Sequence, residues 1–180
     1  QDGTGGAERQ VAVPAGQTKT FTDVLGSVFG LDADFGAIRI TGSNGALNIL
    51  GQTSTPGGGG TFGQSVPVSG PWDLVQVGSP RTIVGVREDA SFRTNLIIAN
   101  VTTAPVEVDL EFRDASGARL GGQREAFLPL EMRQLGKVLS GVPGSPVSIV
   151  LSMPTSNGRV AAYASVIDNT TNDPRTLLPR

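Results

Sequence analysis

Four oxygen-bearing side chains are concentrated in one short polar stretch between two apolar segments. They are Asp168, Asn169, Asn172 and Asp173. Carboxylate and amide oxygens are ligands that calcium accepts, so this stretch predicts a calcium loop. The same residue types also favour an Asx-rich turn, in which the side chains bond to their own backbone. The sequence leaves both interpretations open.

Three further carboxylates alternate along one predicted strand, at Glu107, Asp109 and Glu111. A glycosidase needs two carboxylates held about 5 to 9.5 Å apart across a cleft. The alternation instead favours a solvated strand face, with exposed ion pairs of small energetic value to arginines on neighbouring strands. The candidate partners are Arg93, Arg113 and Arg124.

The residue types required by most other enzyme mechanisms are missing from the sequence. The chain of 180 residues contains no histidine and no cysteine, which excludes histidine-assisted nucleophiles and the usual zinc ligands. The run Gly57 to Gly60 lacks the Lys-Ser/Thr of a phosphate loop. We therefore expect a protein that is not an enzyme and has no cofactor other than the calcium considered above.

Charge and hydropathy also limit the partners. The net charge of −2 provides no strong field for nucleic acid. The sequence has no run of about 18 apolar residues that would insert into a membrane. The single tryptophan, Trp72, follows Gly70-Pro71 in a predicted connector. It could be an exposed anchor for a glycan or protein, or a plug between two domains; of the two, we expect the plug.

The elements that carry these residues are predicted to be β-strands. Residues 106–112 alternate between apolar and acidic side chains, which is typical of a strand with one buried face. The chain also has 25 glycines and 12 prolines, which suit many short strands joined by turns. Further strands are predicted over 9–13, 17–22, 37–41, 46–53, 61–68, 81–87, 92–100, 119–128, 132–139, 147–153, 159–167 and 175–178. A short helical turn capped by Thr22 or Asp23 is predicted, ending at Gly30, and Asn44-Gly45 predicts a hairpin.

Sequence markers recur in the same order in the two halves. Val13-Pro14, Val24-Leu25, Ser43-Asn44-Gly45 and Val66-Pro67 match Leu128-Pro129, Val138-Leu139, Ser156-Asn157-Gly158 and Leu178-Pro179. This pattern predicts an all-β protein of two tandem antiparallel β-sandwich-like units with short helical turns. The predicted limits are 1–68 for the first unit, 69–90 for a connector with short strands, and 91–180 for the complete second unit.

The first unit lacks a counterpart of the strand pair over 92–113 with which the second unit begins. Three explanations stay open. The pair was removed from a longer precursor, the first unit is a smaller sheet that shares strands with the second, or strands of another chain fill the gap. The opening run QDGTGGAERQ is itself typical of a processed product.

The chain resembles a repeated β-sandwich module of large secreted or cell-surface proteins of environmental bacteria. The residues that carry the resemblance are Ala90 to Leu96 with Asn100, Ala162 to Asn169 with Asp173-Pro174, and, in the first repeat, Gly60 to Gln64 with Val66-Pro67. The resemblance implies an immunoglobulin-like or fibronectin-like architecture and no catalytic residues. The missing strand pair is a departure from this pattern.

The expected function is that of a secreted or cell-surface, non-catalytic structural module or a filament subunit. Its expected partners are copies of its own chain or the remainder of a larger precursor. The alternative is an adhesion module that binds a glycan or a protein through loops at one end of the sandwich. Exposure of Trp72 would favour this alternative, and burial of Trp72 would count against it.

Overall fold

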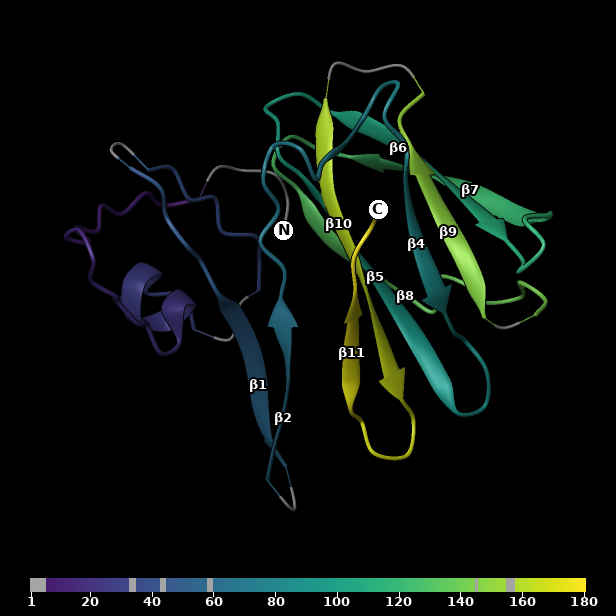
Figure 1. Cartoon of the computed structure of the whole chain (residues 1–180), viewed down its shortest axis with the longest axis horizontal. Coiled ribbons are helices and arrows are strands. Elements are labelled where there is room, and N and C mark those ends of the chain that lie inside the picture. Colours follow the sequence, from purple (N-terminus) through teal and green to yellow (C-terminus); the bar gives the residue numbers. More distant parts are fainter. Residues whose placement is uncertain (1–5, 33–34, 43–44, 58–59, 145, 155–157) are drawn as a thin grey trace.

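The computed structural model describes residues 6–32, 35–42, 45–57, 60–144, 146–154 and 158–180. The protein is all-β, as predicted, and these residues form three antiparallel sheets and one short helix. Two of the sheets face each other as a sandwich, and the third is a separate hairpin (Figure 1).

The first sandwich sheet has five strands. Its main path runs β11-β10-β5-β8, and β3 pairs with the beginning of β10. The strands are β3 (Val75–Gln76), β5 (Phe92–Asn100), β8 (Met132–Gly136), β10 (Arg159–Asp168) and β11 (Pro174–Leu177).

The second sandwich sheet has four strands in the order β4-β9-β6-β7. The strands are β4 (Arg81–Val86), β6 (Val106–Arg113), β7 (Arg119–Phe127) and β9 (Val147–Ser152). The stretch 69–90, predicted to be a connector with short strands, thus supplies β3 to one sheet and β4 to the other. The domain limits themselves stay a prediction.

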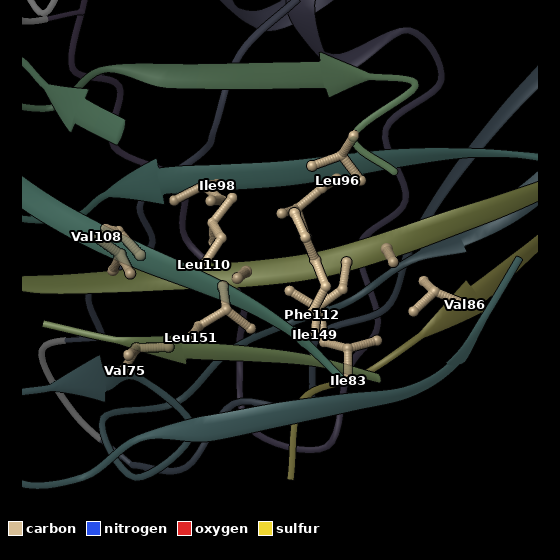
Figure 2. Packing of buried hydrophobic residues seen from close by; sticks show 14 of the residues in the cluster. Val75, Ile83, Val86, Leu96, Ile98, Val108, Leu110, Phe112, Ile149 and Leu151 are labelled. Atoms are coloured by element: carbon tan, nitrogen blue, oxygen red, sulfur yellow. The ribbon is translucent and has the colours of Figure 1, made fainter. Parts of the chain in front are cut away.

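The core lies between these two sheets and is built from the alternating positions of their strands. In β6, Val106, Val108, Leu110 and Phe112 are buried, as the alternation predicted. They meet Leu96 and Ile98 of β5, together with side chains of β4, β9 and β10 (Figure 2). Removing these apolar side chains from water is the main favourable term in the folding of the sandwich.

Strands β5 and β6 do not pair with each other. The sequence suggested a strand pair joined by a short turn, but β5 pairs with β10 and β8, whereas β6 pairs with β9 and β7. The connection 101–105 contains Pro105 and no Asn-Gly or Asp-Gly, so it lacks the residues of a tight hairpin turn. It crosses from one sheet to the other instead.

The N-terminal half contains much less regular structure than predicted. Before residue 69 the described residues hold the short helix η1 (Leu25–Phe29) and the strands β1 (Gly51–Gly57) and β2 (Gly60–Val66). The helix confirms the predicted turn, because Asp23 Oδ1 accepts a hydrogen bond from the Gly26 amide (3.3 Å) and Gly30 ends the helix with φ of 69°.

Three predicted strands of this half, over 9–13, 17–22 and 37–41, are not strands, and the fourth, over 46–53, is a strand only from Gly51 onward. A strand needs a hydrogen-bonded neighbour, and these segments have none in the described part of the chain. The predicted Asn44-Gly45 and Asn157-Gly158 turns include residues outside the described ranges.

The hairpin β1–β2 lies beside β11 and touches the outer surface of the five-stranded sheet (Figure 1). Ser165 Oγ donates to Gln64 Oε1 (2.8 Å), and Thr176 Oγ1 donates to the Ser65 carbonyl oxygen (2.8 Å). Because Ser165 and Thr176 are paired residues of β10 and β11, these polar contacts attach the hairpin to one edge of the sandwich.

Candidate functional site

The stretch predicted as a calcium loop joins β10 to β11. The side chain of Asp168 accepts hydrogen bonds from the backbone amides of Thr170 (2.7 Å) and Thr171 (3.0 Å) through Oδ1. These amide bonds, that of Thr171 first, hold the pKa of the Asp168 carboxyl below its usual range. This is the geometry of an Asx turn, in which the side chain bonds to its own loop backbone.

An arginine from the neighbouring strand binds two side chains of this loop. Arg93 of β5 donates from Nη1 to Asn169 Oδ1 (2.9 Å) and from Nη2 to Asn172 Oδ1 (3.1 Å). A calcium ion bound by these two amide oxygens would therefore have to displace the guanidinium group. No group of three or more His, Cys, Asp or Glu residues that could hold a metal ion occurs among the described residues. The calcium site stays a prediction.

A shallow hollow lies next to this loop, with a volume of about 510 Å³. Its lining includes Asp168 and Asp173 on the loop side and Arg87, Phe92 and Arg175 on the other side. The Arg87 guanidinium lies 4.0 Å from the centre of the Phe92 ring, which is cation–π geometry. Sequence reasoning missed these three residues, because they lie on separate elements that only the fold brings together.

A second hollow, of about 690 Å³, lies on the outer face of the four-stranded sheet. Outward side chains of β4 and β9 form its floor, including Val84 and Val150, and Arg113 and Asp114 stand at its end. Arg113 donates to the Gly117 carbonyl oxygen (3.0 Å), and Asp114 accepts from Ser116 Oγ (2.7 Å). Both charged groups at this end of the hollow therefore form hydrogen bonds with residues of the β6–β7 turn.

Trp72 is not a plug between domains. Its side chain is 88% exposed, on a turn closed by the hydrogen bond from the Asp73 amide to the Gly70 carbonyl oxygen (3.0 Å). The Asp73 carboxylate also accepts from the Gly70 amide (2.9 Å), and the Arg81 guanidinium donates to the Trp72 carbonyl oxygen. The backbone of the turn is well bonded, whereas the indole extends into solvent.

The acidic face of β6 forms ion pairs, as predicted. Arg124 of β7 binds Asp109 through two hydrogen bonds, Nε to Oδ1 (2.6 Å) and Nη2 to Oδ2 (2.9 Å). Its Nη1 also reaches Glu107 (3.3 Å), while Glu111 pairs with Arg113 and Arg119. The hydrogen bonds from Arg124 lower the pKa of the Asp109 carboxyl. Of the three predicted partners, Arg113 and Arg124 are confirmed, and Arg93 binds the β10–β11 loop instead.

No protein-family model, curated protein or solved structure matched this chain. Among the described residues, no helix is long and apolar enough to cross a membrane.

The lowered carboxyl pKa values predict a loss of stability in acid. The pKa is lowered in Asp168, in Asp109 and in Asp114, where the Ser116 hydroxyl is the main cause. A carboxyl group with a lowered folded-state pKa stabilises the fold above its unfolded value of about 3.9, and this stabilisation disappears as the pH falls through the folded value. We expect the free energy of unfolding, measured with urea and circular dichroism, to fall as the pH drops from about 5 to 2.

The variant Asp168→Asn isolates one of these three groups. It should be less stable than the wild type at pH 7, because it lacks the carboxylate that the two amides stabilise. The deficit should be smaller near pH 2 than at pH 7, because acid protonates the wild-type carboxyl group as well. A deficit of the same size at both pH values would contradict this assignment.

Proposed function

We propose that the chain is a non-catalytic structural module of an extracellular bacterial assembly, secreted or held at the cell surface, of the immunoglobulin-like or fibronectin-like repeat type. The observation that carries this proposal is the contrast between the two halves. Residues 74–180 bury a continuous core between two sheets, whereas no described residue from 6 to 73 is buried.

The stretch from residue 6 to residue 73 exposes many large apolar side chains. Phe35, Ile40 and Leu50 are among the exposed ones, and Leu50 is 93% exposed. Singly exposed apolar side chains are ordinary on protein surfaces, but many of them in one part of a chain are typical of a segment that contacts another polypeptide. A module that is built to associate with other polypeptide would carry such a surface, which supports the role of an assembly subunit.

The outer face of the four-stranded sheet supports the same proposal. Glu107, Asp109 and Glu111 are paired there with arginines. Such charged strand faces keep sheets soluble and oppose sheet-to-sheet association. The outer face of the four-stranded sheet thus carries paired charges that favour contact with water, whereas the described residues before 69 expose several large apolar side chains.

The native mass tests this proposal. We expect light scattering over a dilution series to find an oligomer or polymer larger than the 18.5 kDa chain, and negative-stain images of the same sample to show regular particles. A monomer at every concentration, without particles, would overturn the role of a self-assembling subunit.

The exposed indole of Trp72 favours a second candidate function, a module that binds a glycan or a protein. A flat aromatic side chain held on a rigid turn can stack on a sugar ring or insert into a partner. A monomeric result in the mass experiment would leave this candidate in first place.

A further inference from the structure

The hollow next to the β10–β11 loop lies at one end of the sandwich. Two turns come together at this end, residues 87–91 between β4 and β5 and residues 169–173 between β10 and β11 (Figure 1). The Asn169 amide donates to the Ser91 carbonyl oxygen (2.8 Å), and Asn169 Nδ2 donates to the Ala90 carbonyl oxygen (3.2 Å). Hydrogen bonds thus join the two turns that carry the hollow.

The strand register places charged side chains of the hollow on the inner face of the five-stranded sheet. Paired residues of adjacent strands lie on the same face of a sheet, and so do residues two positions apart in one strand. Val166 is 3% exposed in the core and pairs with Arg175. Asp168 follows Val166 by two positions and pairs with Phe92. Asp168, Arg175 and Phe92 therefore continue the row of core positions to the end of the sheet.

Charged residues at inward positions of a sandwich depart from the alternation that builds its core. Such departures from the folding pattern are expected at functional sites. From the opposite sheet, Arg87 follows the last residue of β4 and lines the same hollow. Its guanidinium group stacks on the Phe92 ring and pairs with Asp89 (3.2 Å). Charged groups of both signs thus line the end of the space between the sheets.

Two charged groups of the hollow have no partner within the described part of the chain. Neither the Arg175 guanidinium nor the Asp173 carboxylate forms a hydrogen bond or an ion pair with a described residue. Asp168, by contrast, already accepts from the Thr170 and Thr171 amides. The hollow therefore offers free donors at Arg175 and free acceptors at Asp173.

The remainder of the lining is apolar. Val166 and Pro174 contribute to it together with the Phe92 ring. The volume of about 510 Å³ falls within the range of about 300 to 1,000 Å³ that is typical of small-molecule sites. Such sites combine apolar walls with a few polar groups that orient the ligand.

The balance of charge in the hollow indicates the class of ligand. Arg87 and Arg175 attract an anion, but Asp168 and Asp173 line the same hollow and repel it. A hydroxyl group both donates and accepts, so a neutral polyol satisfies guanidinium and carboxylate groups alike. It also brings no charge that has to be removed from water. A sugar ring has, in addition, C–H faces that pack against apolar walls.

We propose that this hollow binds a neutral saccharide. The sugar hydroxyls accept from Arg175 and donate to Asp173, and a C–H face of the ring packs against Pro174. The inference goes beyond the assembly role and does not depend on it.

This site is separate from Trp72. Arg81, at the start of β4, bonds to the Trp72 carbonyl oxygen, whereas Arg87 follows the end of the same strand. The inference thus deepens the second candidate function, glycan binding, and rests on it, but it places the binding site at the other end of the sandwich.

Titration of the full chain followed by nuclear magnetic resonance tests the proposal. The neutral probes are cellopentaose, maltopentaose, xylopentaose and chitopentaose, and the charged comparisons are galacturonate oligomers and glycylglycine. We expect at least one neutral probe to shift the amide signals of residues 168–175. Arg175→Ala and Asp173→Ala should each weaken its binding at least about tenfold, which corresponds to about 1.4 kcal/mol. Both positions are exposed, so the melting temperature should be unchanged.

Arg159→Ala is the matched control, because Arg159 is an exposed arginine at the other end of β10. It should bind the saccharide like the wild type, and so should Trp72→Ala. Loss of binding in Trp72→Ala but not in Arg175→Ala would overturn this site, while glycan binding through Trp72 would stand. Binding of the charged probes alone would overturn the neutral-saccharide class. If no probe shifts residues 168–175, the site itself is overturned.

Discussion

Replacing Leu110 by alanine is expected to lower the free energy of unfolding by about 3 kcal/mol. Leu110 is 2% exposed and lies on β6, between β9 and β7 in the four-stranded sheet. The truncation removes buried methyl groups and leaves a cavity that the surrounding side chains fill only in part. Urea unfolding followed by far-ultraviolet circular dichroism measures the loss; the exposed Trp72 would report poorly on the core.

The matched control for Leu110→Ala is Val84→Ala on β4 of the same sheet. Val84 is 63% exposed and faces outward, so its truncation should cost well under about 1 kcal/mol. A cost for Leu110→Ala no larger than that of the control would mean that the two sheets do not enclose a packed core.

Replacing Asn100 by alanine is expected to destabilise the protein by about 2 kcal/mol, through lost hydrogen bonds rather than lost packing. Asn100 is 3% exposed at the end of β5. Its Nδ2 donates to the carbonyl oxygens of Ala104 (2.8 Å) and Leu128 (2.9 Å), and its Oδ1 accepts from the amide (3.0 Å) and hydroxyl (2.7 Å) groups of Thr102. The side chain thus holds the crossing between the sheets against the turn that follows β7.

Equilibrium unfolding of Asn100→Ala, compared with Asn48→Ala at an exposed position, measures this effect. Alanine leaves backbone groups of the crossing without partners in a region where little water can replace the side chain. If the two variants have equal stability, the Asn100 network contributes nothing to the fold. The crossing would then be held by packing alone.

Most strands of the second half could be predicted from the sequence, because there the alternation of side chains agrees with the tertiary structure. The predictions over 81–87, 106–112 and 147–153 match β4, β6 and β9 to within about one residue. Each of these strands lies in a two-layer sandwich, so its side chains alternate between core and exterior, and period two in the sequence reports this directly.

Strand pairing could not be predicted in the same way. The turn at Asp114 to Gly117 was recognisable, because Asp114 side-chain bonds and a glycine with φ of 86° are local features. The crossing between β5 and β6 has no comparable local feature, since the partners of both strands come from distant parts of the chain. For the same reason, the hollow beside Arg87 and Arg175 was invisible in the sequence.

The failed strand predictions of the first half have a different physical cause. Residues such as Ile38, Ile40 and Leu47 have the apolar alternation of strands, but a strand forms only when a neighbour accepts its hydrogen bonds and another layer covers its apolar face. In the sandwich, β4, β5 and β6 do this for β9 and β10, whereas no described residue from 35 to 50 lies in a strand.

The sequence by itself determined the all-β class, most strands of the second half and the ion-paired face of β6, because each depends on side-chain periodicity or neighbouring residues. Only the tertiary structure decided that β5 and β6 lie in opposite sheets, that Arg93 binds the β10–β11 loop, that Trp72 faces solvent and that the described residues from 6 to 73 are unburied. These features depend on which distant segments come together, and that is set by the burial of the whole core rather than by any local pattern.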